Sequence, residues 1–140
     1  MFNKKENFSL AKRIRSFKYA LQGIVCLCKT EHNAKIHLVA TLGVVVAGLV
    51  LKIALNEWIA IIFAIGFVWV AESFNTAIEY LCDKVSPEYD ELIRRAKDVA
   101  AAGVLIAAAT AVAVGLIVFV PKITTSATVC PRTTQDPVHR

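Results

Sequence analysis

Residues 99–120 read VAAAGVLIAAATAVAVGLIVFV, and this stretch decides the fold class of the chain. None of its side chains is charged, and a helix of this length is about 33 Å long, enough to cross the hydrocarbon core of a bilayer. Proline cannot supply the backbone N–H that a continuing helix needs. The stretch therefore predicts a transmembrane helix over residues 98–120 that ends at Pro121.

A second apolar block, residues 36–51, lies closer to the N-terminus and is interrupted only by His37. Lys35 and Lys52 flank it, and lysine side chains at helix ends can extend their ammonium groups to the headgroups. The block is barely long enough to span a membrane. It predicts a transmembrane helix over residues 35–53.

A third block begins at Trp58, an aromatic residue of the kind enriched at membrane interfaces, and is wholly apolar as far as Ala71. Polar residues follow, but the helical pattern continues. The block predicts a transmembrane helix over residues 57–82, and the Ser86-Pro87 pair predicts the turn that leads to the last helix.

The N-terminal segment is amphipathic. With Ser9 as N-cap, apolar residues recur at spacings of three and four, and basic residues fall between them. The apolar set is Leu10, Ile14, Phe17, Leu21, Ile24 and Val25, and the basic set is Lys12, Arg13, Arg15 and Lys18. We expect a helix that lies in the headgroup plane. An ordinary soluble amphipathic helix is the alternative, which the nearby membrane segments disfavour.

The composition supports a membrane protein of one domain. The chain has 140 residues, of which 56% are hydrophobic, above the roughly 45–50% of soluble proteins. The net charge of +5 arises from basic residues at the ends of apolar blocks, which favours anionic lipid headgroups over nucleic acid as partner. The four cysteines have no zinc-ligand spacing and are expected to be small apolar fillers.

The predicted fold class is thus all-α and integral to the membrane, with a surface helix followed by three transmembrane helices. Residues 1–8 and 123–140 are predicted to be disordered. Lysine and arginine are concentrated in the N-terminal segment and in the second loop, so both are expected on the cytoplasmic side and the C-terminus outside.

The polar end of the third block holds the most informative residues. Glu72, Asn75, Glu79 and Asp83 stand at i, i+3, i+7 and i+11, which places them on one helix face. Each carboxylate costs roughly 2.5–3.5 kcal/mol at mid-bilayer, so this face must meet a partner, a metal or water. A structural alternative is that the acids pair with basic residues of the last helix, namely Arg94, Arg95 and Lys97, and hold the helices together.

Two further groups suit phosphoryl transfer. Glu31 lies on the same side of the membrane as Glu79, and together they could provide oxygen ligands for Mg²⁺, although Glu31 could simply pair with Lys35 one turn away. Lys97 and the arginines before it could hold ATP phosphates, and Asp98 could orient Lys97, although these residues could also be a positive-inside anchor.

The sequence has neither a P-loop nor a G-x-G-x-x-G motif. From the residues alone, three classes of protein stay open. They are a membrane enzyme, a small transporter or channel subunit that moves ions past its acids, and a non-enzymatic assembly protein.

The order and spacing of several motifs resemble a known family. They are Ser16-Phe17-x-x-Ala20-x-x-Gly23, Glu31-x-Asn33-x-Lys35-Ile36-His37, Glu72-x-x-Asn75-Thr76-Ala77-Ile78-Glu79-x-x-x-Asp83 and Ala96-Lys97-Asp98. From Ser16 to Phe119 the chain is similar to the prokaryotic diacylglycerol kinases, a family that includes undecaprenol kinases. The second motif looks more like the undecaprenol branch.

The resemblance implies a homotrimeric lipid kinase domain over residues 9–122, in the bacterial inner membrane, that uses ATP with Mg²⁺ at the cytoplasmic interface. It implies that Glu72 is the general base and that Glu31 and Glu79 are the metal ligands. It implies a nucleotide-binding set made of Lys12, Tyr19, Glu31, Asn75, Glu79, Glu88, Tyr89, Asp90, Lys97 and Asp98. The lipid it implies is undecaprenol or diacylglycerol.

Overall fold

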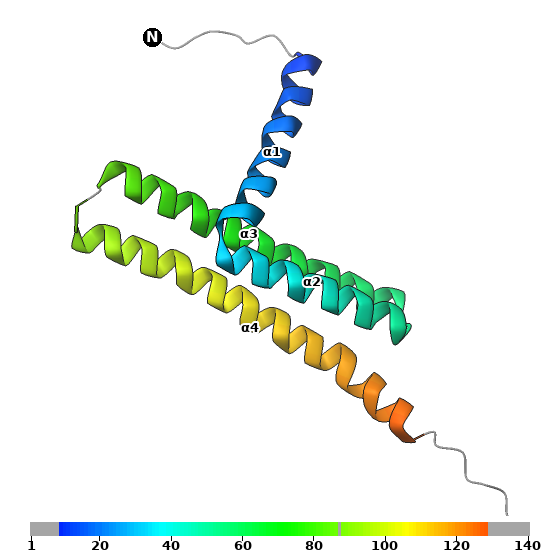
Figure 1. The fold of residues 1–140 in the computed structure, drawn as a ribbon. Coiled ribbons are helices and arrows are strands. Elements are labelled where there is room, and N and C mark those ends of the chain that lie inside the picture. The colour runs from blue at the N-terminus through cyan, green and yellow to red at the C-terminus, as the bar shows by residue number, and fades with distance from the viewer. Residues whose placement is uncertain (1–8, 87, 129–140) are drawn as a thin grey trace, which may run out of the picture.

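The computed structural model describes residues 9–86 and 88–128, which form four helices and, over those residues, no strand (Figure 1). The helices are α1 (Leu10–Thr30), α2 (His32–Val50), α3 (Leu55–Val85) and α4 (Glu91–Thr128). The last three are long and apolar enough to cross a membrane. The all-α prediction with three membrane helices is therefore confirmed.

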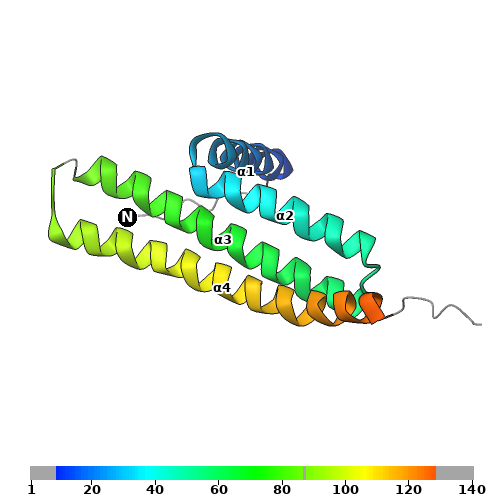
Figure 2. The same ribbon diagram turned by 60° about the horizontal axis from the view of Figure 1, so that its bottom comes forward.

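Helices α3 and α4 form an antiparallel hairpin and pack along much of their length, whereas α2 lies beside α3 with fewer contacts (Figures 1 and 2). Helix α1 points away from these three helices (Figure 1). Most large apolar side chains on all four helices are exposed in the single chain, as expected for surfaces that meet lipid or other copies.

Helix α1 begins at Leu10, directly after the predicted N-cap. The Ser9 side chain makes no capping hydrogen bond, and only its carbonyl oxygen accepts a bond from the Arg13 N–H, at 3.3 Å. The helix ends at Thr30 because Glu31 adopts an extended conformation, with φ −91° and ψ 128°. This single residue separates α1 from α2 and lets the two helices diverge.

A tight turn joins α2 to α3, and a small apolar cluster closes that end of the molecule. Lys52 takes a positive φ of 50° in the turn. The cluster is built on Ile53, Ile61 and Val118, and the ring of Trp58 packs against it and over the backbone of Gly48. The start of α3 is thereby held close to the end of α2 and to α4.

The end of α4 differs from the prediction. We expected the helix to stop at Pro121 and residues 123–140 to be disordered, but α4 continues through Pro121 to Thr128. Proline removes one backbone donor without forcing the following residues out of the helix. The hydroxyl groups of Thr124 and Thr125 donate to the Pro121 carbonyl oxygen, at 3.0 and 2.8 Å, and so satisfy an acceptor near the helix end. Residues 1–8 and 129–140, also predicted to be disordered, lie outside the described residues.

Candidate active site

The polar face of α3 is buried where the helix passes α2. Glu72 is 1% exposed, and Asn75 and Thr76 are each 5% exposed. Asn75 Nδ2 donates to Glu79 Oε1 at 2.9 Å, so these side chains lie one turn apart on a shared face, as their spacing predicts. A buried carboxylate and a buried amide therefore lie on the same face of a membrane-spanning helix.

These buried groups keep unused hydrogen-bonding capacity. Glu72 Oε2, Asn75 Oδ1 and Thr76 Oγ1 are buried and have no hydrogen-bond partner among the described residues. Buried polar atoms are normally satisfied, and exceptions ask for an explanation such as a bound ligand, ion or water. Because the unsatisfied atoms gather around Glu72, the face has the properties of a binding site.

Helix α2 contributes His37, a residue to which the sequence pattern assigned no role. Its Nε2 atom lies 3.8 Å from Glu72 Oε2, its side chain is 17% exposed, and within the described part of the chain this nitrogen also has no hydrogen-bond partner. The pairing depends on how α2 is rotated against α3. The only sequence signal is a histidine within an apolar block, one turn and a half after Glu31.

Glu31 lies at the junction of α1 and α2 and is tied to α3. Its Oε1 accepts hydrogen bonds from the Tyr80 hydroxyl at 3.0 Å and from the Thr30 hydroxyl at 3.1 Å. Glu72 lies within electrostatic range of both Glu31 and Glu79, as well as of His37. The structure thus gathers the three predicted carboxylates in one region, and Tyr80 and Thr30 are contacts that spacing did not reveal.

The carboxylates of this region do not form a complete metal site by themselves. Across residues 9–86 and 88–128, no three His, Cys, Asp or Glu side chains form a ready cluster for a metal ion. Mg²⁺ is commonly held by one or two carboxylates together with phosphate oxygens and water, so a full protein cage is not required. Glu79, with the unsatisfied Asn75 Oδ1 beside it, fits that incomplete kind of site, and Glu31 lies in the same region.

The basic residues of α4 lie further along the hairpin. Lys97 forms an ion pair with Asp83 that joins α4 to α3, and Asp98 accepts a 2.6 Å bond from Arg94 Nη1. Among the described residues, neither Glu72 nor Glu79 pairs with a lysine or arginine. The structural alternative, in which these acids hold the helices together through the basic residues of α4, therefore applies to Asp83 alone.

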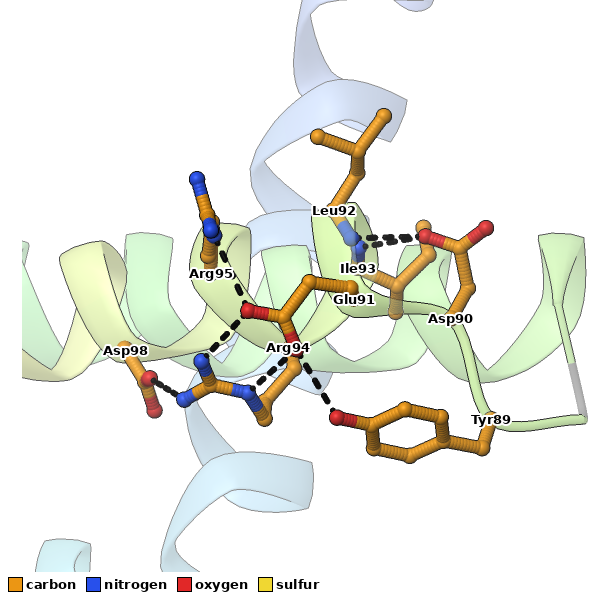
Figure 3. Close-up of polar contacts among 8 residues, drawn as sticks. All are labelled: Tyr89, Asp90, Glu91, Leu92, Ile93, Arg94, Arg95 and Asp98. Carbon is orange, nitrogen blue, oxygen red and sulfur yellow. Dashed lines mark hydrogen bonds and ion pairs between the residues drawn. The ribbon is translucent and has the colours of Figure 1, made fainter.

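Figure 3 shows how the beginning of α4 is organised around Glu91. Its carboxylate accepts hydrogen bonds from the side chains of Arg94, Arg95 and Tyr89, at distances between 2.8 and 3.0 Å. Asp90 Oδ1 caps the helix by accepting the N–H groups of Leu92 and Ile93, at 2.7 and 3.1 Å. The two arginines are therefore paired with two acids of their own helix, Glu91 and Asp98.

Part of the predicted nucleotide-binding set is not brought to Glu72 within one chain. Lys12 and Tyr19 are exposed on α1, which points away from the other helices (Figure 1). Glu88, Tyr89 and Asp90 lie beyond the end of α3, about 20 Å along the helix from Glu72. Only Glu31, Asn75 and Glu79 of the predicted set accompany the candidate base.

Two pockets meet at His37. One has a volume of 300 Å³ and a partly polar lining that includes Asn33, Asn75 and Glu79. The other has a volume of 370 Å³ and a nearly apolar lining drawn from α2, α3 and α4, which includes Val44 and Phe119. His37 lines both pockets, and its Nε2 atom faces Glu72, which lines neither of them.

Over the described residues, fold and site together define an all-helical membrane protein in which a buried carboxylate faces a histidine that lines both a partly polar and a nearly apolar pocket. The chain belongs to the prokaryotic diacylglycerol kinase family, because the model of that family matches residues 18–119. Membership makes the chain a membrane lipid kinase, and no finding favours the transporter alternative.

Several curated relatives agree with this membership. The chain is 32% identical over 123 residues to the undecaprenol kinase of Bacillus subtilis strain 168, which covers 88% of this chain and all of that relative. It is 34% identical over 109 residues to a diacylglycerol kinase of Synechocystis sp. PCC 6803, covering 77% of this chain and 62% of that relative. It is 33% identical over 99 residues to the diacylglycerol kinase of Escherichia coli K12, covering 71% and 81%.

Proposed function

We propose that this chain transfers the γ-phosphoryl group of Mg-ATP to the hydroxyl of undecaprenol, with Glu72 as general base, at the cytoplasmic face of the bacterial inner membrane. The observation that carries the proposal is the buried Glu72 carboxylate, one oxygen of which has no hydrogen-bond partner in residues 9–86 and 88–128. Undecaprenol is preferred to diacylglycerol because the match to the B. subtilis undecaprenol kinase extends over the whole of that protein.

In the proposed reaction, Glu72 Oε2 accepts the proton of the lipid hydroxyl while the hydroxyl oxygen forms a bond to the γ-phosphorus. The bond between that phosphorus and the oxygen bridging to the β-phosphate breaks, and ADP leaves. A bound Mg²⁺ would offset the negative charge of the phosphate oxygens, and Glu31 and Glu79 would hold it. Asn75 positions Glu79 through its 2.9 Å hydrogen bond.

The remaining phosphate contacts are proposed for Lys97 and Asp98. Lys97 has an exposed partner in Asp83, and a phosphate oxygen could replace that carboxylate. Two parts of the predicted nucleotide-binding set are poorly placed to reach a nucleotide at Glu72 within one chain. Lys12 and Tyr19 lie on α1, which points away from α3, and residues 88–90 lie beyond the end of α3. A homotrimer in which a neighbouring copy supplies these residues would complete the nucleotide site.

The experiment that tests the proposal is phosphate transfer from labelled Mg-ATP to undecaprenol and to diacylglycerol, each offered separately in mixed micelles. Glu72→Gln keeps the shape of the side chain and removes the base, and we expect transfer to fall by about 10²- to 10⁴-fold. Glu57→Gln is the matched control, because Glu57 lies on the same helix about 22 Å away, in an ion pair with Lys122.

Each outcome has a defined meaning. Labelled undecaprenol from the wild type and from Glu57→Gln, with none from a folded Glu72→Gln protein, supports the proposal. Transfer to diacylglycerol alone would correct the lipid and leave the role of Glu72 in place. Undiminished transfer by Glu72→Gln would refute the assignment of the base.

A further inference from the structure

We propose that His37 binds the hydroxyl oxygen of the acceptor lipid and holds it against Glu72, so that the pair forms the seat of the lipid alcohol. The inference rests on the proposed function, since it assumes that a lipid hydroxyl is deprotonated at Glu72. His37 is then a positioning residue that favours an alcohol over a ketone or an ether as acceptor, and Glu72 remains the base.

The geometry of the pair carries the inference. His37 Nε2 and Glu72 Oε2 are 3.8 Å apart, which is too far for a hydrogen bond between them. Neither atom is accessible to solvent, so an oxygen atom that lies within about 2.8 Å of both requires a small movement of the surrounding side chains. Both atoms are buried and without a hydrogen-bond partner among the described residues, so the site has two facing polar atoms for which the chain itself provides no partner.

A hydroxyl group has the properties that these two atoms require. It offers one proton to donate and lone pairs to accept, so it can donate to the Glu72 carboxylate and accept from an N–H of the imidazole at the same time. A ketone or an ether could accept from His37 but would leave Glu72 Oε2 unsatisfied. The pair therefore selects an alcohol.

The two pockets fit the rest of such a molecule. The nearly apolar 370 Å³ pocket extends from His37 towards Val44 and Phe119 and suits a hydrocarbon chain. The 300 Å³ pocket on the other side holds Asn75 and Glu79, the residues proposed to lie next to the metal and the phosphates. A lipid alcohol is an apolar chain that ends in a hydroxyl, and His37 stands at the junction where that end would lie.

The proposed step moves one proton and leaves His37 unchanged. The imidazole donates a hydrogen bond from Nε2 to the hydroxyl oxygen, and the hydroxyl proton passes to Glu72 Oε2 as the oxygen bonds to phosphorus. Because His37 acts on the acceptor alone, its loss should weaken the use of lipid without changing the use of ATP.

The test compares His37→Gln with His37→Leu. The amide nitrogen of glutamine reaches close to the position of Nε2 and can still donate, whereas leucine fills similar space without a donor. We expect His37→Leu to lower kcat/KM for the lipid about tenfold or more, with KM for ATP unchanged, and His37→Gln to restore most of the loss. His32→Gln, on the exposed start of α2, is the control and should match the wild type.

The outcomes separate this inference from the proposed function. Wild-type lipid kinetics in both His37 variants, together with an inactive Glu72→Gln, would overturn the role of His37 and leave the kinase proposal intact. A rise in KM for ATP equal to the loss for lipid would also overturn it, and so would failure of glutamine to rescue in a folded protein. Full transfer by Glu72→Gln would refute both proposals together.

Discussion

Gly48 offers the sharpest structural test, because an added methyl group there has no room. A Cβ atom built on Gly48 would lie 2.8 and 2.9 Å from two ring atoms of Trp58, and 3.1 Å from Ile53 Cδ1. Overpacking of this kind costs about 1–3 kcal/mol, and the ring of Trp58 is part of the cluster that closes this end of the molecule. We expect Gly48→Ala to lower the free energy of unfolding by an amount in this range, reduced by the helix propensity that alanine gains.

Gly43→Ala, in the same helix, separates the cost of overpacking from the gain in helix propensity. A Cβ atom on Gly43 meets nothing within 4 Å, so this variant should show only the propensity gain, up to about 1 kcal/mol. The measurement is unfolding of both variants in detergent micelles titrated with a denaturing detergent, followed by tryptophan fluorescence. Equal stability of Gly43→Ala and Gly48→Ala would refute the close contact between α2 and Trp58.

Two further predictions concern contacts between helices. Trp69 Nε1 donates to Thr41 Oγ1 at 3.1 Å and joins α3 to α2, so Thr41→Val should lower the free energy of unfolding by about 0.6 kcal/mol, and at most about 1.7, while Thr41→Ser stays near the wild type in the same titration. A larger loss for serine than for valine would contradict this hydrogen bond. Lys97→Met should lower kcat/KM for ATP about 10- to 100-fold if Lys97 holds a phosphate, whereas Asp83→Asn, which removes only its partner, should leave ATP turnover largely intact. Equal effects of the two substitutions in steady-state kinetics would limit Lys97 to a structural role.

Much of the fold could be predicted because membrane helices depend on local composition. The length of the uncharged stretch 99–120 was sufficient to predict a membrane helix there. The period of a helix was sufficient to predict that Asn75 and Glu79 share a face. The predicted end of α4 was wrong. The prediction considered the N–H group that Pro121 lacks but not the hydroxyl groups of Thr124 and Thr125, which bind the Pro121 carbonyl oxygen.

The contacts within the site could be predicted less well from the sequence, because they depend on how each helix is rotated about its axis relative to its neighbours. The approach of His37 to Glu72 is set by the rotation of α2 about its axis, and no spacing within one helix specifies that rotation. The pairing of Lys97 with Asp83 likewise follows from the register of α3 against α4, which no spacing within one helix specifies. The family resemblance implied roles for residues but did not reveal these contacts.

The three long helices are packed unevenly, and this affects which substitutions could change the preference for the acceptor alcohol. Helices α3 and α4 are joined along much of their length, so the position of Glu72 depends on many small contacts, none of which is decisive. Helix α2 is placed by a few identifiable ones, such as the Trp58 ring on Gly48 and the bond from Trp69 to Thr41. If the acceptor alcohol binds at Glu72 as proposed, substitutions at those few positions would shift α2 as a unit and change which alcohols fit beside the carboxylate, without altering any residue proposed to take part in the chemistry. Acceptor preference could therefore diverge between related chains through changes remote from the reacting atoms.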